Sequence, residues 1–454
     1  MAIINKKKDP IYTHGGGKAS HIKPEEELRR SVLACLLWED QFYESGKSIS
    51  ERIIDLCRKV DDIFISNLAS EAREEQHLRH VPLLLCRELA RKRSKFTANT
   101  LYEVIQRADE LTEFLALYWQ NGRCPLSAQI KKGLAKAFTK FDEYQLAKYN
   151  RNTDIKLKDV LFLCHAKPKN KDQEELWKRL INDELTVPNT WETRLSSGEN
   201  KRETFTDLIN NRKIGGLAFL RNLRNMTDAG ISKEILSKGF ETANFSKVLP
   251  FRFISAAKAC PKHEDLIDKQ FLQNAGQNKI PGTTLLVIDV SGSMYGGRVS
   301  KNSDMDRAVA ACALGAVIRE CCENPIIYAT AGNDCTRVHD TALVPNRRGM
   351  SLVDAIYKMC SELGGGGIFL NQVCKYIDSK EKGVDIDRMI VITDEQDCSR
   401  PDDSPDKATP LGKNNYMINI SSYDRGIAYG KWTHITGWSE SVINYIREIE
   451  KPLN

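Results

Sequence analysis

The clearest chemical signal in the sequence is a carboxylate at the end of an apolar run, followed by two hydroxyls at alternate positions. In the stretch TTLLVIDVSGSMYGG, residues 283–297, the apolar residues lead into Asp289, and Ser291 and Ser293 follow. A loop at this point can turn both hydroxyls to the side of the carboxylate. Such hard oxygen donors suit Mg²⁺, Mn²⁺ or Ca²⁺ better than Zn²⁺. The stretch predicts a divalent-cation site; the alternative is that the serines only cap the following helix.

A second apolar run brings another carboxylate to the same place. The run RMIVITD ends at Asp394, and ligands of open parallel sheets bind just outside the carboxyl ends of the strands. Catalysis by this edge is disfavoured. The letters DVSGS do not match the G-x-S-x-G turn of serine hydrolases, and no histidine presents itself as a base. An aspartyl-phosphate enzyme would use Asp289 as nucleophile, but such sites usually carry a second nearby carboxylate and a lysine clamp. We predict a binding protein and not an enzyme.

A β-sheet would bring these acidic residues together, and the sequence from residue 281 onward predicts such a sheet. Buried-looking strands, TTLLVIDV, PIIYAT, RMIVITD and YMINISS, alternate with helical stretches such as DRAVAACALGAVIRECC and LVDAIYKMC, and SESVINYIREIE closes the chain. Strands that alternate with helices indicate parallel strands with helical crossovers, a doubly wound α/β fold. We expect this domain to cover residues 281–454, after a polar linker at residues 271–282.

The preceding part of the chain predicts a different architecture. Residues 25–280 read as successive helices with one apolar stripe each, as in PEEELRRSVLACLLW, where Pro24 suits a first helical position and the glutamates suit the positive end of the helix dipole. Many similar helices in series favour a HEAT-like helical-repeat domain, which we place at residues 1–270. No regular repeat period is visible.

Composition narrows the class of protein. The 454 residues are 41% hydrophobic and 28% charged, which is typical of soluble globular proteins. No apolar run has the length of a membrane span, and the lysines at the N-terminus precede no apolar stretch that would make a secretory signal. We therefore expect a cytoplasmic protein. The 13 cysteines form no CxxC pair, so we expect reduced thiols without a disulfide framework or zinc site.

Charge is distributed unevenly between the two predicted parts. Residues 1–280 contain 48 Lys and Arg against 38 Asp and Glu, a net charge of +10, whereas residues 281–454 contain 19 against 23, a net charge of −4. A basic field of this kind attracts polyanions. The basic residues are densest between Lys131 and Lys171, where Tyr144 and Phe162 are interleaved. Lysines contact phosphates and exposed rings stack on unpaired bases; the alternative is a solvated helix face with extended lysine stems.

Individual basic residues in this part are candidates for contacts with the phosphates of a polyanion. Arg221 and Arg224 lie one helical turn apart in LRNLRNM, so they share a side of a helix; they either meet phosphates or tie neighbouring repeats together. Gly15-Gly16-Gly17-Lys18 lacks the full spacing of a phosphate-binding loop, so we predict no nucleotide site there. The candidate RNA-binding residues from the charge pattern are Arg29, Arg30, Lys136, Lys140, Arg151, Lys156, Lys158, Arg221 and Arg224.

Two groups of motifs resemble known families. DVSGSM resembles the Asp-x-Ser-x-Ser motif of von Willebrand factor A domains, whose metal-ion-dependent adhesion site binds a divalent cation. The resemblance implies Asp289, Ser291 and Ser293 as ligands from the first loop and Asp394 as the carboxylate of the third. The second loop of the family offers a threonine after paired glycines. In LGGGGIFL, Gly367 stands at that position, so one oxygen ligand is missing and we expect weaker binding of Mg, Mn or Ca or none.

The stretches THGGGKASHIKPEEELRR, DVLFLCHAKPKN, VPNTWETRLSSG and FTDLINNRKIGGLAFLRNLRNMTDAGI resemble the TROVE module of telomerase-associated, Ro and vault proteins. Ro proteins join this module to a C-terminal von Willebrand A domain, in the order predicted here. The resemblance implies a ring of helical repeats closed by the A domain. It also implies Y-like non-coding RNA on the outer surface, single-stranded or misfolded RNA ends in the central hole, a monomer, a role in RNA quality control and an exoribonuclease as possible partner.

The resemblance carries His165 and Lys167 over to the Y-RNA surface, because DVLFLCHAKP matches the Ro segment that presents a histidine and a lysine there. The Ro family often has an arginine where this chain has Phe162, so this position departs from the family's pattern at the Y-RNA surface. The competing hypothesis is a metal-dependent protein adhesion module with a helical scaffold. A nuclease or phosphotransferase is the weaker third alternative.

Overall fold

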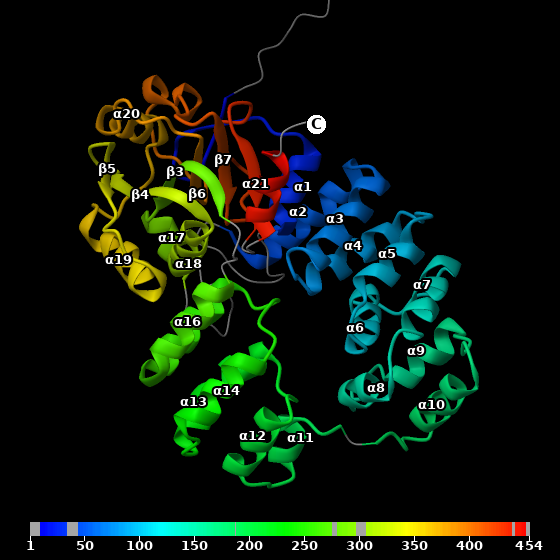
Figure 1. Ribbon diagram of the computed structural model, residues 1–454. Helices are drawn as coiled ribbons and strands as arrows, with labels where there is room; N and C mark the ends of the chain where they lie inside the picture. Colours follow the sequence, from blue (N-terminus) through cyan, green and yellow to red (C-terminus); the bar gives the residue numbers. More distant parts are fainter. Residues whose placement is uncertain are drawn as a thin grey trace, which may run out of the picture. The chain divides into compact units, whose positions relative to one another are not determined.

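The computed structural model describes residues 10–33, 44–186, 188–274, 279–296, 306–437 and 441–450. The chain packs into two units, one made of residues 53–247 and the other of residues 1–52 together with 248–454 (Figure 1). We call the first the helical unit and the second the sheet unit. No helix in the described segments combines the length and the apolar character that a membrane crossing requires.

The helical unit is a series of short helices. Each packs mainly on the next one or two along the chain, for example α3 on α4 and α5, and α7 on α5 and α9, as in a stack of helical repeats. Helix α2 (Gly46–Lys59) crosses from the sheet unit into this unit. The other helices are α3 (Asp62–Glu74), α4 (His80–Arg91), α5 (Thr97–Val104), α6 (Asp109–Tyr118), α7 (Ala128–Phe138), α8 (Glu143–Tyr149), α9 (Leu157–Cys164), α10 (Lys171–Ile181), α11 (Trp191–Ser196), α12 (Lys201–Asn210), α13 (Gly216–Asp228) and α14 (Lys233–Thr242).

Side-chain caps and glycines set where these helices begin and how closely they pack. Asp61, Ser127 and Asn170 each accept a hydrogen bond from a main-chain N–H in the first turn of α3, α7 and α10, which satisfies donors that the helix leaves unpaired. A Cβ at Gly133 of α7 would lie 2.9 Å from the carbonyl oxygen of Ala98. Glycine therefore allows α7 to approach α5 closely.

The sheet unit contains a six-stranded sheet in the order β5-β4-β3-β6-β7-β8. All pairs are parallel except β4 with β5. The order reverses between β3 and β6, which is the switch point where doubly wound sheets bind ligands. The strands are β3 (Ile280–Asp289), β4 (Cys322–Asn333), β5 (Val338–Leu343), β6 (Arg388–Thr393), β7 (Asn414–Asn419) and β8 (Thr433–Thr436); the helices are α17 (Gly292–Gly296), α18 (Arg307–Glu320), α19 (Gly349–Glu362), α20 (Leu370–Lys380) and α21 (Ser441–Ile449).

The core of the sheet unit lies on both faces of the central strands. Leu285 and Val287 of β3 pack with Val373 and Ile377 of α20. Ile288 faces the other way, because a Cβ at Gly315 of α18 would meet its Cδ1 atom at 2.5 Å. Burial on both faces explains why β3 and β6 read as continuous apolar runs.

The predicted doubly wound sheet is confirmed as an architecture, with additions. The antiparallel edge strand β5, the short β8 and the hairpin of β1 (Ile11–Tyr12) and β2 (Lys18–Ala19) were not predicted. The packing units also differ from the predicted domains, residues 1–270 and 281–454. Helices α1 (Pro24–Leu33), α15 (Pro250–Ala259) and α16 (Glu264–Asn274) belong to the sheet unit, where α15 packs on α18 and α16 on α19.

Parts of the sequence predictions lie outside the described residues. These are positions 34–40 at the end of the first predicted helix, positions 275–278 of the predicted linker and positions 439–440 at the start of the last helix. The twelve cysteines of the described segments form no disulfide, and ten of them are buried.

The glycine-rich segment near the N-terminus packs against the loop that follows β6. The hydroxyl of Thr13 donates to the carbonyl oxygen of Asp397 at 2.6 Å, and the N–H of Gly17 donates to the same oxygen at 2.8 Å. A Cβ at Gly17 would lie 2.3 Å from that oxygen, and one at Gly15 would lie 2.7 Å from the Cys398 sulfur. The glycines are therefore explained by close packing, and not by phosphate binding.

His14 joins this segment to a small charged cluster. Its Nε2 lies 3.4 Å from Oδ1 of Asp424 and 3.7 Å from Oε1 of Glu44. Arg52 contacts Glu44 at 2.6 Å, and Arg425 contacts Asp424 at 3.5 Å. The hydrogen bonds to Asp424 and Glu44 raise the pKa of His14 to about 9. The imidazolium form is thus stabilised by folding at neutral pH.

We predict that His14 stabilises the chain in a pH-dependent way. Because its folded pKa is above its unfolded value, the contribution is complete below the unfolded pKa and is lost as pH rises through about 9. The variant H14Q should lose about 1 kcal/mol near pH 6, a value that allows for solvent screening, and almost nothing above the folded pKa. Urea unfolding at several pH values measures this. A loss that does not change with pH would contradict the ion-pair explanation.

Candidate functional site

The predicted metal ligands come together at the switch point of the sheet. Asp289 ends β3, Asp394 directly follows the parallel neighbour β6, and both are fully buried. Oδ1 of Asp289 accepts from the N–H of Ser291 at 2.9 Å, and the two serine hydroxyls, of Ser291 and Ser293, lie 3.3 Å apart. The main chain therefore folds the first loop back over Asp289 and holds the hydroxyls beside it.

The donor set fits a divalent cation on physical grounds. Oδ1 of Asp394 accepts from the N–H of Gln396 at 3.0 Å, whereas its buried Oδ2 finds no hydrogen-bond donor among the described residues. Burial raises the pKa of Asp394. Burial, and then the charge of Asp394, raise the pKa of Asp289 to about 7. Two buried carboxylates with one oxygen unsatisfied are costly without a counter-charge, and a hard cation would supply it.

The second loop shows why the expected threonine is missing. The N–H of Gly367 donates to Oδ1 of Asp334 at 2.7 Å. A Cβ at Gly367 would lie 2.1 Å from the sulfur of Cys398. A threonine therefore cannot occupy this position unless Cys398 moves. The departure from the A-domain motif is part of the packing of this loop.

Sequence reasoning missed one hydroxyl at this edge. The side chain of Thr393 donates to Oδ2 of Asp289 at 2.6 Å and accepts from the N–H of Glu395 at 2.9 Å. It bridges the ends of β3 and β6. The available signal was its place directly before Asp394 in RMIVITD.

The structure overturns the prediction that Arg30 contacts RNA. Arg30 is only 2% exposed. Its guanidinium donates to Glu395 at 2.5 Å, to the hydroxyl of Tyr429 at 3.1 Å and to the carbonyl oxygen of Arg425 at 3.0 Å. Despite burial, Arg30 and then His434 lower the pKa of Glu395 to about 2. Arg30 is an interior anchor of α1, and no phosphate reaches it. Its neighbour Arg29 is half-buried on the same helix.

Two predicted lysines already have partners in the helical unit. The ammonium of Lys140 donates to the carbonyl oxygens of Tyr102 and Ile105 at the end of α5, the latter at 2.8 Å. Burial lowers the pKa of Lys140. Lys158 forms an ion pair with Asp183 at 2.7 Å. Both lysines hold neighbouring helices together, so an RNA contact would have to compete with these bonds.

The other predicted basic residues are on the surface or close to it. Lys136 is exposed on α7, and its ammonium lies 4.1 Å from the centroid of the Tyr102 ring. His165 and Lys167 are exposed just after α9, which packs on α7. The structure thus brings these three into one region. Lys156, half-buried, is the N-cap residue of α9.

Arg221 and Arg224 lie apart from this region, exposed on α13. The neighbouring asparagines behave differently. Asn222 is buried and donates to the carbonyl oxygen of Ala218 at 2.9 Å, and Asn225 donates to Asn222 at 3.3 Å. The arginines therefore remain candidates for phosphate contacts, whereas the asparagines bond within their own helix.

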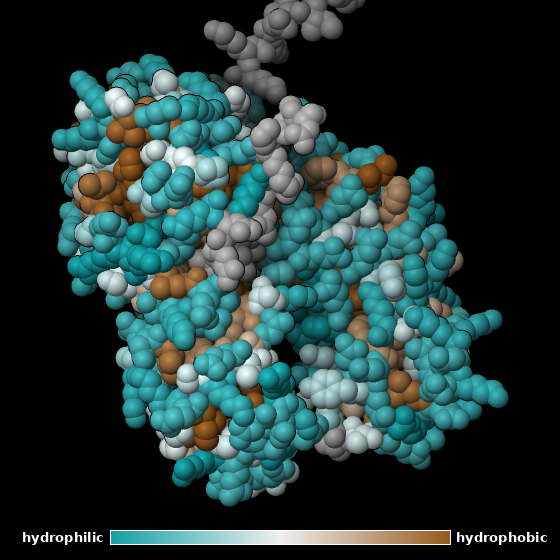
Figure 2. Space-filling model, in the orientation of Figure 1, coloured by the Kyte–Doolittle hydropathy of each residue, from teal (hydrophilic) through white to brown (hydrophobic). Residues whose placement is uncertain are grey.

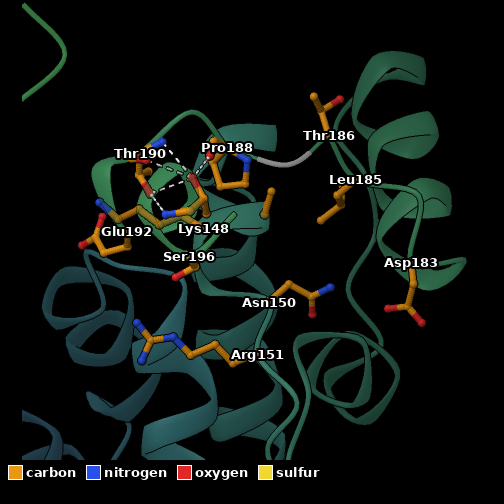
Figure 3. Close-up of a pocket in the computed structure, with 12 residues that line it drawn as sticks. Lys148, Asn150, Arg151, Asp183, Leu185, Thr186, Pro188, Thr190, Glu192 and Ser196 are labelled. Carbon is orange, nitrogen blue, oxygen red and sulfur yellow. Dashed lines mark hydrogen bonds between the residues drawn. The ribbon is translucent and has the colours of Figure 1, made fainter. Parts of the chain in front are cut away.

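Arg151 is exposed and lines a cavity of about 440 Å³ between the end of α8, the segment before α11 and α11 itself. Figure 3 shows Asn150 between Arg151 and the side chains of Asp183 and Leu185. Lys148 and Glu192 also line the cavity. Because the lining contains both cations and carboxylates, it does not select for a polyanion.

Surface polarity in Figure 2 agrees with this picture. Hydrophilic side chains cover most of the visible face of both units, and apolar residues form separate patches. This face therefore offers polar and charged contacts over wide areas, with small apolar patches between them.

Comparison with known proteins finds one family match and a similar fold. Residues 177–343 match the model of the TROVE domain. Telomerase protein component 1 of Mus musculus is 29% identical in an alignment 119 positions long, which covers 22% of this chain and 4% of that protein. The Ro (RSR) protein of Deinococcus radiodurans has a similar fold, with a TM-score of 0.54 at 14% identity over 92% of this chain and 96% of that chain. The chain thus contains a TROVE-domain match and has a fold similar to that of the Deinococcus Ro protein.

These matches confirm the predicted resemblance to the TROVE module. The matched segment begins in α10 and ends at β5, so it starts later and ends later than the predicted TROVE domain, residues 1–270. The chain spans only a small part of the mouse relative, and the likeness to the Deinococcus protein shows the fold alone. The role of each site residue therefore stays a prediction.

We predict that removal of the Arg30 side chain destabilises the sheet unit even when no ligand is present. The variant R30M leaves Glu395 buried and unpaired, and loss of one partner of a buried pair costs about 3–5 kcal/mol. Urea unfolding of the full chain measures the loss. The double variant R30M/E395Q should recover part of it. A loss for R30M below about 1 kcal/mol would show that the pair is not the anchor we infer.

Proposed function

We propose that this chain is a non-catalytic, Ro-like RNA-binding protein of a ribonucleoprotein. The observation that carries the proposal is the exposed basic surface around α7 and α9, and the TROVE-domain match over residues 177–343 supports it. Among the described residues, neither Lys136 nor Lys167 forms an ion pair, and neither do Lys131 and Lys132 on the same surface. Unpaired cations of this kind bind phosphates without reading sequence.

The finer assignment follows the Ro resemblance. Y-like RNA would lie on the outer surface near His165 and Lys167, and single-stranded or misfolded RNA ends would enter a central hole that Arg221 and Arg224 could line. A cytoplasmic monomer that acts in RNA quality control, with an exoribonuclease as partner, completes this proposal. The exposure of all four side chains supports it.

The acidic edge of the sheet unit supports a second, separate role. We propose that Asp289, Ser291, Ser293 and Asp394 bind Mg²⁺, Mn²⁺ or Ca²⁺, since the buried Oδ2 of Asp394 lacks a donor among the described residues. The bound cation would offer an open position to an acidic group of a protein partner. In this proposal the sheet unit docks a protein partner while the helical unit binds RNA. In the alternative, a metal-dependent adhesion module, the helical unit would be only a scaffold and would bind no ligand.

RNA binding by the basic surface should depend steeply on salt. For single strands, the logarithm of the binding constant falls linearly with the logarithm of the salt concentration, and each phosphate contact adds about 0.7 to the slope. The double variant K136Q/K167Q should therefore reduce the slope by about 1.4 when fluorescence anisotropy of a labelled single-stranded RNA is measured at several salt concentrations. K358Q/K382Q, which removes two exposed lysines of the sheet unit, is the matched control and should keep the slope. A wild-type affinity that does not change with salt concentration would refute the proposal.

Cation binding should depend on Asp289 and be separable from RNA binding. Titration calorimetry with Mn²⁺, supported by its electron paramagnetic resonance signal, should show binding to the wild type and at least about tenfold weaker binding to D289N, because loss of even an outer partner costs about 10–100-fold. D289N should retain RNA affinity and lose capture of acidic protein partners. If the wild type binds no Mg²⁺, Mn²⁺ or Ca²⁺, the metal assignment is wrong; if D289N loses RNA binding, the two roles are not separate.

A further inference from the structure

A cavity of about 590 Å³ opens in the helical unit between the end of α6, the start of α7 and the end of α9. We call it the Trp119 cavity. Its volume is in the usual range for sites that hold small organic groups. The residues that line it are Trp119, Arg123, Cys124, Pro125, Leu126, Lys131, Phe162, Leu163 and His165.

Flat side chains dominate the walls of the Trp119 cavity. The indole of Trp119 is half-buried, and its Nε1 donates to the carbonyl oxygen of Cys124 at 2.8 Å. The guanidinium of Arg123 lies 4.7 Å from the centroid of that ring. Phe162 is 58% exposed, which is unusual for so large an apolar side chain. Aromatic rings and guanidinium planes are the groups on which proteins stack unpaired bases.

The charge of the Trp119 cavity distinguishes it from two other cavities of the same unit. Its lining contains Arg123, Lys131 and His165 and no carboxylate. The cavity of about 440 Å³ contains Asp183 and Glu192 beside its cations. A third cavity, of about 480 Å³, contains Glu199 and Asp207, and both carboxylates pair with Arg194. Only the Trp119 cavity, of these three, combines aromatic walls with a purely cationic rim.

The last turn of α9 fixes two of the walls. His165 ends the helix in the left-handed conformation, with φ of 52°, and its N–H donates to the carbonyl oxygen of Phe162 at 3.2 Å. The N–H of Ala166 donates to the carbonyl oxygen of Leu161 at 3.3 Å. This closed helix end fixes the main chain that carries Phe162 and His165, so binding has to order only their side chains.

We propose that the Trp119 cavity binds one unpaired base of an RNA, stacked on Trp119 and Phe162, while Arg123, Lys131 and His165 contact the adjacent phosphates. The inference rests on the proposed RNA-binding function and specifies the part of the RNA that is recognised. It also explains a departure from the Ro resemblance, in which an arginine often stands at Phe162. In this chain a stacking surface replaces a phosphate contact, so the site selects for unpaired over paired nucleotides.

The test compares a labelled RNA strand of about 12 nucleotides with a sugar-phosphate strand of the same length that lacks bases. One stacked base contributes about 1–3 kcal/mol, which corresponds to about 5–150-fold in affinity. F162A should therefore weaken binding of the RNA at least about fivefold and leave binding of the baseless strand unchanged. F162Y should retain wild-type affinity, because it keeps the ring. Circular dichroism checks that each variant is folded.

Charge and stacking should separate in the same assay. K131Q should lower the salt slope by about 0.7 for both strands, whereas F162A should keep the slope. RNA should also quench the fluorescence of Trp119, and the variant W119F should remove that part of the quenching.

The outcomes distinguish this inference from the proposed function. If the wild type binds neither strand, RNA binding itself is refuted. If the wild type binds RNA and F162A binds it equally well, RNA binding stands and the base site is refuted. Equal losses of F162A for the RNA and the baseless strand would likewise refute stacking, and would instead show that Phe162 only shapes the surface.

Discussion

Burial of negative charge at the ends of β3 and β6 is the constraint on which the sheet unit depends. Asp289, Asp394, Glu395 and Asp397 are all fully buried at one edge of the sheet, and such a concentration of carboxylates is unfavourable unless each finds a counter-charge or donors. Glu395 has Arg30, and Asp397 accepts from two main-chain N–H groups, of Leu370 and Ser399. Asp394 has the charge of Arg307 nearby, but its Oδ2 still has no hydrogen-bond donor among the described residues. Asp289 and Asp394 are therefore the position where an external cation has most to contribute.

The same constraint explains why a segment far away in the sequence belongs to the sheet unit. Arg30 reaches Glu395 from α1, Thr13 and Gly17 bond to the carbonyl oxygen of Asp397, and the N–H of His14 donates to Gln396 at 2.8 Å. The N-terminal segment therefore supplies charge and donors to the loop after β6. That loop also carries Asp394. Helix α1 therefore supports the candidate metal site indirectly, by fixing the loop that carries this ligand.

Much of this arrangement was predictable from the sequence, and the limits are physical. Apolar runs that are buried on both faces identify strands such as β3 and β6, and their carboxyl ends placed Asp289 and Asp394 together. The edge strand β5 was missed because VHDTAL has no continuous apolar run. Arg30 was misread because a charged side chain on an amphipathic helix normally faces water, and its partner Glu395 lies 365 positions away in the sequence. The sequence likewise cannot show that Cys398 fills the space beside Gly367, since only the folded loops bring them together.

The helical unit follows a different principle at its candidate sites, which stay open to water and whose lysines, among them Lys131, Lys136 and Lys167, are in no ion pair with the described residues. A long-range charge field brings a polyanion to such a surface but does not distinguish one RNA structure from another. Discrimination needs groups that a duplex cannot satisfy, and an exposed ring beside a fixed indole is such a group, since paired bases already stack on one another. Phe162 and Trp119 therefore contribute what the lysines around them cannot, a preference for nucleotides that lack a partner.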